Sequence, residues 1–149
     1  MMMPDIVSLR PAVAADLPAV SALLRDAGLP VDGLDDQFGP AYVVAVEGDA
    51  IVGAEGIERY GRAGLLRSAV VSRAWRGRGL GDRLTRDRLS WASEQQLREV
   101  WLLTTTAGDY FPRFGFATAN RSDAPAELQE SPEFKTACPA TATAMRLIL

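Results

Sequence analysis

The sequence predicts an α/β (α+β) fold, with helices on both faces of a mixed central sheet of about six or seven strands. One observation is a series of three strand-like segments joined by turns over residues 41–72, which indicates an antiparallel meander. Another is the helical segment and short apolar strand that follow, because this order favours a right-handed parallel crossover. The chain has 149 residues, 48% of them hydrophobic, and we expect a single domain over residues 1–149.

The first predicted elements are a strand at residues 6–10, where apolar and polar residues alternate weakly, and a helix at residues 17–27. Apolar residues recur at helical spacing through the second of these segments. Asp16 is a good N-cap, Pro18 fits a first helical turn, and Gly28 can end the helix in a left-handed conformation.

The meander comes next, after a short polar stretch at residues 34–39 that we expect to form one helical turn. Its three strands are predicted at residues 41–47, 50–58 and 65–72. Gly48 and Asp49 suit a two-residue hairpin turn because glycine readily adopts a positive φ, and residues 59–62 provide the second turn.

The second half of the sequence alternates helices and strands. Residues 79–94 predict a helix in which Leu80, Leu84 and Trp91 share one face. Leu89 points the other way, so we expect this helix to be covered on both sides. The remaining elements are expected at 99–104 (a buried strand), 107–114 (a second short helix), 116–119 (a strand), 124–128 and 132–137 (helical turns) and 142–149 (the last strand).

Two features of the composition exclude much chemistry. The sequence has no histidine, which excludes Ser-His-Asp triads and His-ligated zinc sites. Its one cysteine, Cys138, excludes an intrachain disulfide and a CxxC motif, and we expect it to be a packed small side chain. Catalysis must therefore use carboxylates, hydroxyls, arginines or the backbone.

Hydropathy and charge limit where the protein is expected to be located and which partners it is expected to have. The sequence has no run of 18 apolar residues and no signal peptide, so we expect a cytoplasmic protein with no membrane partner. The net charge of −3 argues against a general nucleic-acid binder. Residues 67–88 nevertheless contain seven arginines and two acids, a local balance of +5. Charge alone leaves two interpretations open, a discrete anion site or a solvated arginine face.

The glycine- and arginine-rich segment 76–81 lies between a predicted strand and a predicted helix. N–H groups at a helix N-terminus are unpaired and carry partial positive charge. Glycines let an anion approach these groups, and arginines add charge-assisted hydrogen bonds, so the segment predicts a pyrophosphate site. It is not a P-loop, because Asp82 follows Gly81 where a lysine is required, and its G-x-G-x-G spacing is not that of a Rossmann loop.

The same segment resembles a known signature. Arg76-x-x-Gly79-x-Gly81 is similar to the Q/R-x-x-G-x-G/A pattern with which the GNAT acetyltransferase superfamily binds the pyrophosphate of acetyl-CoA. The strand at residues 69–71 and the segment 107–116 resemble the family as well, so the resemblance covers about residues 41–119. The tail, with Ser131-Pro132-Glu133-Phe134 and then Cys138-Pro139, resembles the arsenic-resistance branch of these acetyltransferases.

This resemblance implies an N-acetyltransferase that uses acetyl-CoA as co-substrate and needs no metal. It also implies that the fourth and fifth strands splay apart, that the pantetheine arm enters the gap, and that transfer is direct in a ternary complex. The N–H of Val71 is then expected to polarise the thioester carbonyl. The residues implied to bind the cofactor are Ala69, Val70, Val71, Arg76, Gly77, Arg78, Gly79, Leu80, Gly81, Thr104 and Phe111.

Two catalytic residues are predicted. Glu58, at the end of a predicted strand, is the candidate base for the substrate amine, and Glu55 is the alternative. In the family a tyrosine protonates the leaving thiolate, but Phe111 stands at that position here. The adjacent Tyr110 is the candidate acid, and the other interpretation is that the thiolate leaves unprotonated.

Arg67 and Ser68 are the candidate substrate-binding residues. We expect Arg67 to share a strand face with Ala69 and Val71 and to fork onto a carboxylate or oxyanion, with a surface ion pair as the alternative, while Ser68 faces the other way. The expected substrate is a small amine, either an amino-acid-like metabolite or a toxin met in resistance. The alternative function is a catalytically weak CoA-binding, sensing or interaction module, and the resemblance is compatible with a homodimer.

Overall fold

The computed structural model describes residues 6–137, 139 and 141–149, and Cys138 lies outside this part of the chain. Within it, one seven-stranded sheet has the order β1-β2-β3-β4-β5-β7-β6. The strands are β1 (Val7–Pro11), β2 (Tyr42–Glu47), β3 (Ala50–Tyr60), β4 (Ala63–Val71), β5 (Glu99–Thr104), β6 (Ala117–Ala119) and β7 (Thr143–Ile148). Only β4 and β5 pair in parallel among these strands, so the predicted mixed sheet is confirmed.

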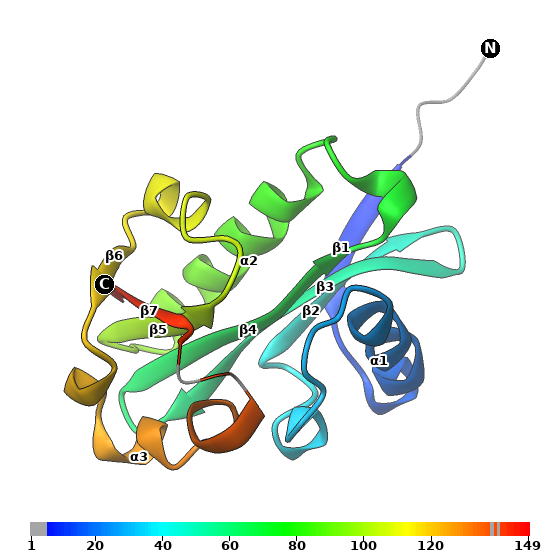
Figure 1. Ribbon diagram of the computed structural model, residues 1–149. Coiled ribbons are helices and arrows are strands. Elements are labelled where there is room, and N and C mark those ends of the chain that lie inside the picture. The colour runs from blue at the N-terminus through cyan, green and yellow to red at the C-terminus, as the bar shows by residue number, and fades with distance from the viewer. Residues whose placement is uncertain (1–5, 138, 140) are drawn as a thin grey trace.

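Helices lie on both faces of the sheet, as the sequence predicts. The α-helices are α1 (Leu17–Asp26), α2 (Leu80–Glu94) and α3 (Ala126–Gln129). Figure 1 shows α2 on one face and α1 and α3 on the other. Alternate side chains of β2 follow this division, since Tyr42 and Val44 pack with α1 whereas Val43 and Ala45 pack with α2. None of the described helices combines the length and the apolar character needed to cross a bilayer.

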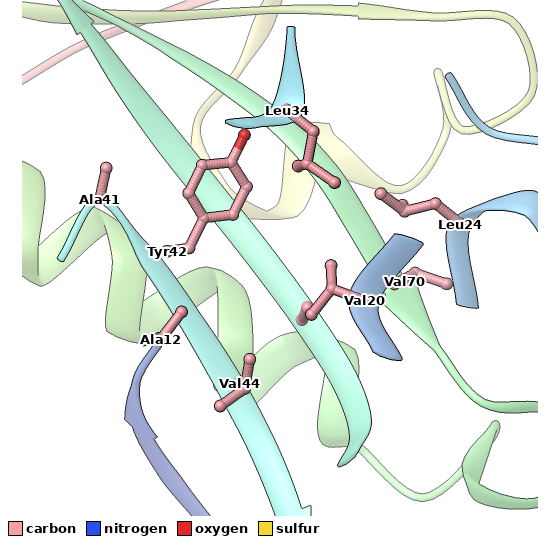
Figure 2. Close-up of a cluster of buried hydrophobic side chains, with 9 residues drawn as sticks. Ala12, Val20, Leu24, Leu34, Ala41, Tyr42, Val44 and Val70 are labelled. Carbon is pink, nitrogen blue, oxygen red and sulfur yellow. The ribbon is translucent and has the colours of Figure 1, made fainter. Parts of the chain in front are cut away.

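The helix α1 is held by one apolar face. Val20 and Leu24 are completely buried and pack in one cluster with Tyr42 and Val44 of β2 and Val70 of β4 (Figure 2). This pattern is the helical periodicity seen in the sequence, and it packs α1 against β2 and the end of β4.

Asp16 stands at the N-cap of α1, but the prediction that it caps this helix is wrong. Its side chain makes no cap bond to α1 and turns back to accept the N–H of Val13 at 2.8 Å. The guanidinium of Arg10 donates two further bonds to it, at 2.7 and 2.9 Å, and holds the pKa of Asp16 below its usual range. The ion pair with β1 outcompetes the helix N–H groups for this carboxylate.

Two predicted boundaries also differ. The strand β3 runs on to Tyr60, so the second turn of the meander is Gly61-Arg62 and not residues 59–62. The helix expected at residues 107–114 is reduced to a 3₁₀ turn at Phe111–Phe114. Pro112 lacks the N–H that an α-helix requires, and this removes the support for a longer helix.

Two irregularities of β4 shape the centre of the sheet. Its parallel pairing with β5 covers just three residue pairs, from Ala63↔Glu99 to Leu65↔Trp101, and the strands separate beyond them. Its pairing with β3 also shifts, since Ser68 has φ +59° and forms a β-bulge opposite Glu55. These features open the sheet at the segment that the sequence assigns to the cofactor.

Candidate active site

The turn between β4 and α2 has the open backbone that an anion site requires. Gly77 and Gly79 have φ values of +77° and +81°, and a Cβ built on either would meet nothing within 4 Å. Gly79 is the N-cap of α2 and no side chain caps the helix there. The N–H groups of the first turn of α2 are therefore left without a side-chain acceptor, on a surface that is free of side-chain bulk.

Arginines and a buried leucine complete this turn. The Nε of Arg76 donates to the carbonyl of Val71 at 3.1 Å, which ties the turn to the end of β4. The guanidinium of Arg78 lies 4.7 Å from the centre of the Trp75 ring. Leu80 is buried in the core beneath α2, so it offers this surface its backbone alone.

A small cavity of about 160 Å³ lies between α2 and the open part of β4. It brings together the predicted cofactor residues of β4 with Gly81 and Phe111, although these lie far apart in sequence. Its lining residues are Glu55, Ala69, Val70, Val71, Gly81, Leu84, Thr85, Ala107, Tyr110 and Phe111.

Glu55, the alternative base, lies in this smaller cavity. Its side chain is 1% exposed, and the hydroxyl of Thr85 on α2 donates to its Oε1 at 2.8 Å. Its Oε2 has no partner among the described residues. Burial raises the pKa of Glu55 to about 8, so the carboxyl is mostly protonated at neutral pH.

Tyr110, the candidate acid, lines the same cavity. Its hydroxyl donates to Oδ1 of Asp82 at 2.6 Å, and a Cβ on Gly81 would lie 3.3 Å from that hydroxyl. Partial burial and the neighbouring Asp82 raise the pKa of Tyr110 above its usual value. The tyrosine therefore stays protonated and lies against the first turn of α2.

A larger cavity of about 450 Å³ lies on the other face of the sheet. It contains the predicted residues Arg67, Ser68 and Thr104, and the Oγ1 of Thr104 accepts the N–H of Ala107 at 2.9 Å. The lining comes from the end of α1 with the loop after it (Ala27, Gly28, Leu29, Pro30), from β4 (Leu66, Arg67, Ser68, Ala69), from β5 and the loop that follows (Leu102, Leu103, Thr104, Thr105, Thr106, Ala107, Phe111) and from the tail (Glu133, Pro139). The two cavities share Ala69, Ala107 and Phe111 as walls.

Arg67 is buried, with 3% exposure, so the alternative of a surface ion pair is wrong. Its Nη1 donates to the carbonyl of Asp32 at 2.7 Å and its Nε to Ser68 Oγ at 3.1 Å. Ser68 was expected on the opposite face, and this too is wrong, because the bulge at Ser68 breaks the alternation of β4 and turns both side chains into one cavity.

Glu58, the predicted base, belongs to a hydrogen-bonded network beside this cavity and does not line it. Tyr42 donates to its Oε2 at 2.6 Å and Tyr60 donates to its Oε1 at 3.0 Å. Arg67 Nη1 lies 3.9 Å from the same Oε2. Both carboxylate oxygens of Glu58 are thus engaged within the fold.

Sequence reasoning missed Glu133. This residue lines the larger cavity, is 4% exposed, and has its Oε1 at 3.5 Å from Arg67 Nε. Its Oε2 has no partner among the described residues, and burial raises the pKa of Glu133 to about 7. The tail has no clear periodicity that could have pointed to it, and its one signal was the resemblance carried by residues 131–134.

Comparisons with known proteins agree with this architecture. Residues 39–118 match the family model of the acetyltransferase (GNAT) domain. No curated protein is similar enough in sequence to match. Similar solved structures include an N-acetylglutamate synthase from Neisseria gonorrhoeae complexed with coenzyme A and L-arginine, at 20% identity and a TM-score of 0.80, over 98% of this chain and 34% of that one.

Two others match over nearly their whole length. They are Rv2747 from Mycobacterium tuberculosis in complex with CoA (23% identity, TM-score 0.79, 95% of this chain and 99% of that one) and an acetyltransferase of the GNAT family from Staphylococcus aureus Mu50 (14% identity, TM-score 0.76, 97% and 99%). The chain spans about a third of the length of the Neisseria synthase. At these identities the likeness shows a shared fold.

Proposed function

The chain belongs to the GNAT acetyltransferase family, and from this premise we propose that it transfers the acetyl group of acetyl-CoA to the nitrogen of a small amine, directly in a ternary complex. The observation that carries the proposal is the pair of cavities that share Ala69, Ala107 and Phe111 where β4 and β5 separate. A thioester in the smaller cavity and an amine in the larger one meet at this shared wall. Direct transfer needs such a meeting point and no covalent enzyme intermediate.

The donor side of the proposed complex is built by β4 and the turn after it. The pyrophosphate of acetyl-CoA binds the N–H groups of residues 77–81, and the pantetheine arm follows β4 past Ala69 and Val71. The N–H of Val71 then stabilises the negative charge that develops on the thioester oxygen. The CoA held by the Neisseria and Mycobacterium proteins supports this donor, and the proposed chemistry uses no metal.

Tyr110 is the proposed donor of a proton to the leaving sulfur. It lines the smaller cavity with Ala69 and Val71, and its raised pKa means that the hydroxyl is protonated at neutral pH. Phe111 stands where the family has a tyrosine and forms part of the wall between the cavities.

The acceptor side favours an amine that also carries a carboxylate or similar oxyanion. Arg67 supplies a buried positive charge to the wall of the larger cavity, beside Ser68. A second structure of the Neisseria synthase contains N-acetyl-glutamate, an acetylated amino acid. The proposed substrate is therefore an amino-acid-like metabolite or toxin, and the resemblance of the tail to the arsenic-resistance branch favours the toxin.

The function is tested by measuring acetyl-CoA binding calorimetrically and thiol release with a panel of amino acids and amino-acid-like toxins. Saturable binding and amine-dependent thiol release are expected. Binding without release for any amine points to the alternative of a CoA-binding module, which the presence of Phe111 at the usual tyrosine position favours. Absence of saturable binding excludes both functions.

A further inference from the structure

The larger cavity has one carboxylate whose bonding is incomplete. Glu133 Oε2 has no partner among the described residues, whereas its Oε1 faces Arg67. A buried carboxylate oxygen normally accepts hydrogen bonds, so an oxygen without one beside a cavity calls for a donor from outside the chain. We propose that Glu133, rather than Glu58, accepts the proton of the substrate amine, and this proposal rests on the acetyltransferase function proposed above.

The tail holds Glu133 firmly at this position. Phe134 is buried in one apolar cluster with Leu65 and Trp101, which anchors the residue next to Glu133 in the core. The Oγ of Ser131 accepts the N–H of Phe134 at 3.3 Å, and the carbonyl of Ser131 accepts the N–H of Lys135 at 3.0 Å. The backbone on both sides of Glu133 is thereby fixed, which a proton acceptor needs for a defined geometry.

The other two buried glutamates are less suited to this role. Tyr42 and Tyr60 occupy both oxygens of Glu58, which does not line the cavity. Glu55 lies in the smaller cavity with Thr85, on the face of the sheet where the donor binds. Glu133 is the one of the three that lines the acceptor cavity.

The surroundings of Glu133 suit a base that works near neutral pH. The Nε of Arg67 on β4 lies 3.5 Å from Oε1 of Glu133 and favours the charged form of this carboxyl group. Glu58 on β3, which accepts hydrogen bonds from Tyr42 and Tyr60, disfavours that charge. On its own segment, Lys135 pairs with the exposed Glu130 at 2.6 Å. Burial outweighs Arg67, and the resulting pKa of about 7 lets the carboxylate take up and release a proton at neutral pH.

The proposed step balances as follows. The substrate ammonium gives one proton to Glu133, which later passes it to solvent, and the neutral amine attacks the carbonyl carbon of the thioester. A C–N bond forms and the C–S bond breaks. The second proton lost by the nitrogen balances the proton that the sulfur takes up, so the products are the N-acetyl compound and free CoA.

The test compares Glu133→Gln with Glu130→Gln, a matched control three residues away on the surface. We measure kcat between about pH 5 and pH 9 and the affinity for CoA. In the wild type kcat is expected to rise with pH around pH 7, since the base works once it is deprotonated. Glu133→Gln is expected to lower kcat about 100-fold and to lose this rise, with unchanged CoA affinity, whereas Glu130→Gln behaves as wild type.

A second measurement separates proton transfer from a structural role. An amine that is already neutral at the assay pH needs no base, so Glu133→Gln should then lose less than about tenfold in kcat. An equal loss for both kinds of amine, or an unchanged pH profile in Glu133→Gln, overturns the proposal. If Glu133→Gln does not fold, Glu133→Asp provides the test, because its shorter side chain places the carboxylate farther from the amine. This variant is expected to lower kcat roughly tenfold while kcat still rises with pH. An unchanged kcat in Glu133→Asp overturns the proposal.

These outcomes are distinct from a failure of the proposed function. If the wild type releases no thiol with any amine, the acetyltransferase function falls and the assignment of Glu133 falls with it. If the wild type is active and Glu133→Gln is equally active, the function stands and the role of Glu133 alone is rejected.

Discussion

Two buried carboxyl groups are expected to make the stability of this protein depend on pH. Burial raises the pKa of Glu55 to about 8 and that of Glu133 to about 7. In the unfolded chain both groups titrate near the ordinary pKa of a glutamate, so between that pKa and pH 8 the folded state binds more protons than the unfolded state. The stability that these protons contribute is fully present below the ordinary glutamate pKa, and it is lost as the pH rises through 7 and 8.

Glu55→Gln should therefore reduce the pH dependence of stability. The amide cannot ionise, and its carbonyl can still accept the bond from Thr85. We expect the free energy of unfolding in urea to fall less steeply between pH 5 and pH 8 than in the wild type, with the remaining slope due partly to Glu133. Glu130→Gln, at an exposed carboxylate, serves as the control, and an identical slope in wild type and Glu55→Gln contradicts the neutral state of Glu55.

At the scale of elements, the turn before α2 should be sensitive to a single methyl group. Gly79→Ala forces a Cβ onto a residue with φ +81°, at a cost of about 1 kcal/mol, and places that Cβ where the pyrophosphate is proposed to bind. Gly28→Ala at the end of α1 is the matched control, since its φ is +71° and its Cβ also meets nothing within 4 Å. Both variants should lose similar stability, but Gly79→Ala alone should weaken CoA binding, by at least about tenfold. Equal CoA affinities in the two variants would place the pyrophosphate elsewhere.

The elements differ in how well the sequence predicted them. The sequence located the helix at residues 79–94 and the strand at residues 99–104 to within one residue, because a helical spacing of apolar residues marks the first and a short continuous apolar run marks the second. The bulge at Ser68 escaped prediction, since a serine with positive φ is imposed by neighbouring strands and leaves no local signal. Glu133 escaped for the same reason. Its environment is built by β4 and the tail together, and its partner Arg67 is 66 positions away in the chain.

At the scale of the whole molecule, the opening between β4 and β5 should be the region most affected by CoA. The segments after Leu65 and Trp101 do not pair with each other, although they lie in the middle of the sheet. If pantetheine fills this opening, amide hydrogen exchange at residues 66–71 and 102–104 should slow on adding CoA, while exchange in β1 and β2 stays unchanged. Uniform slowing across the sheet would show general stabilisation instead of binding at the opening.

The short parallel pairing between β4 and β5 also divides the sheet into two parts. Three residue pairs join β1–β4 to the group formed by β5, β7 and β6, and we call the boundary between these two groups the seam. If the donor binds along the seam as proposed, it supplies contacts between β4 and β5 that the polypeptide leaves out. Each catalytic cycle would then make and break a piece of the sheet, and release of free CoA would require these contacts to be lost.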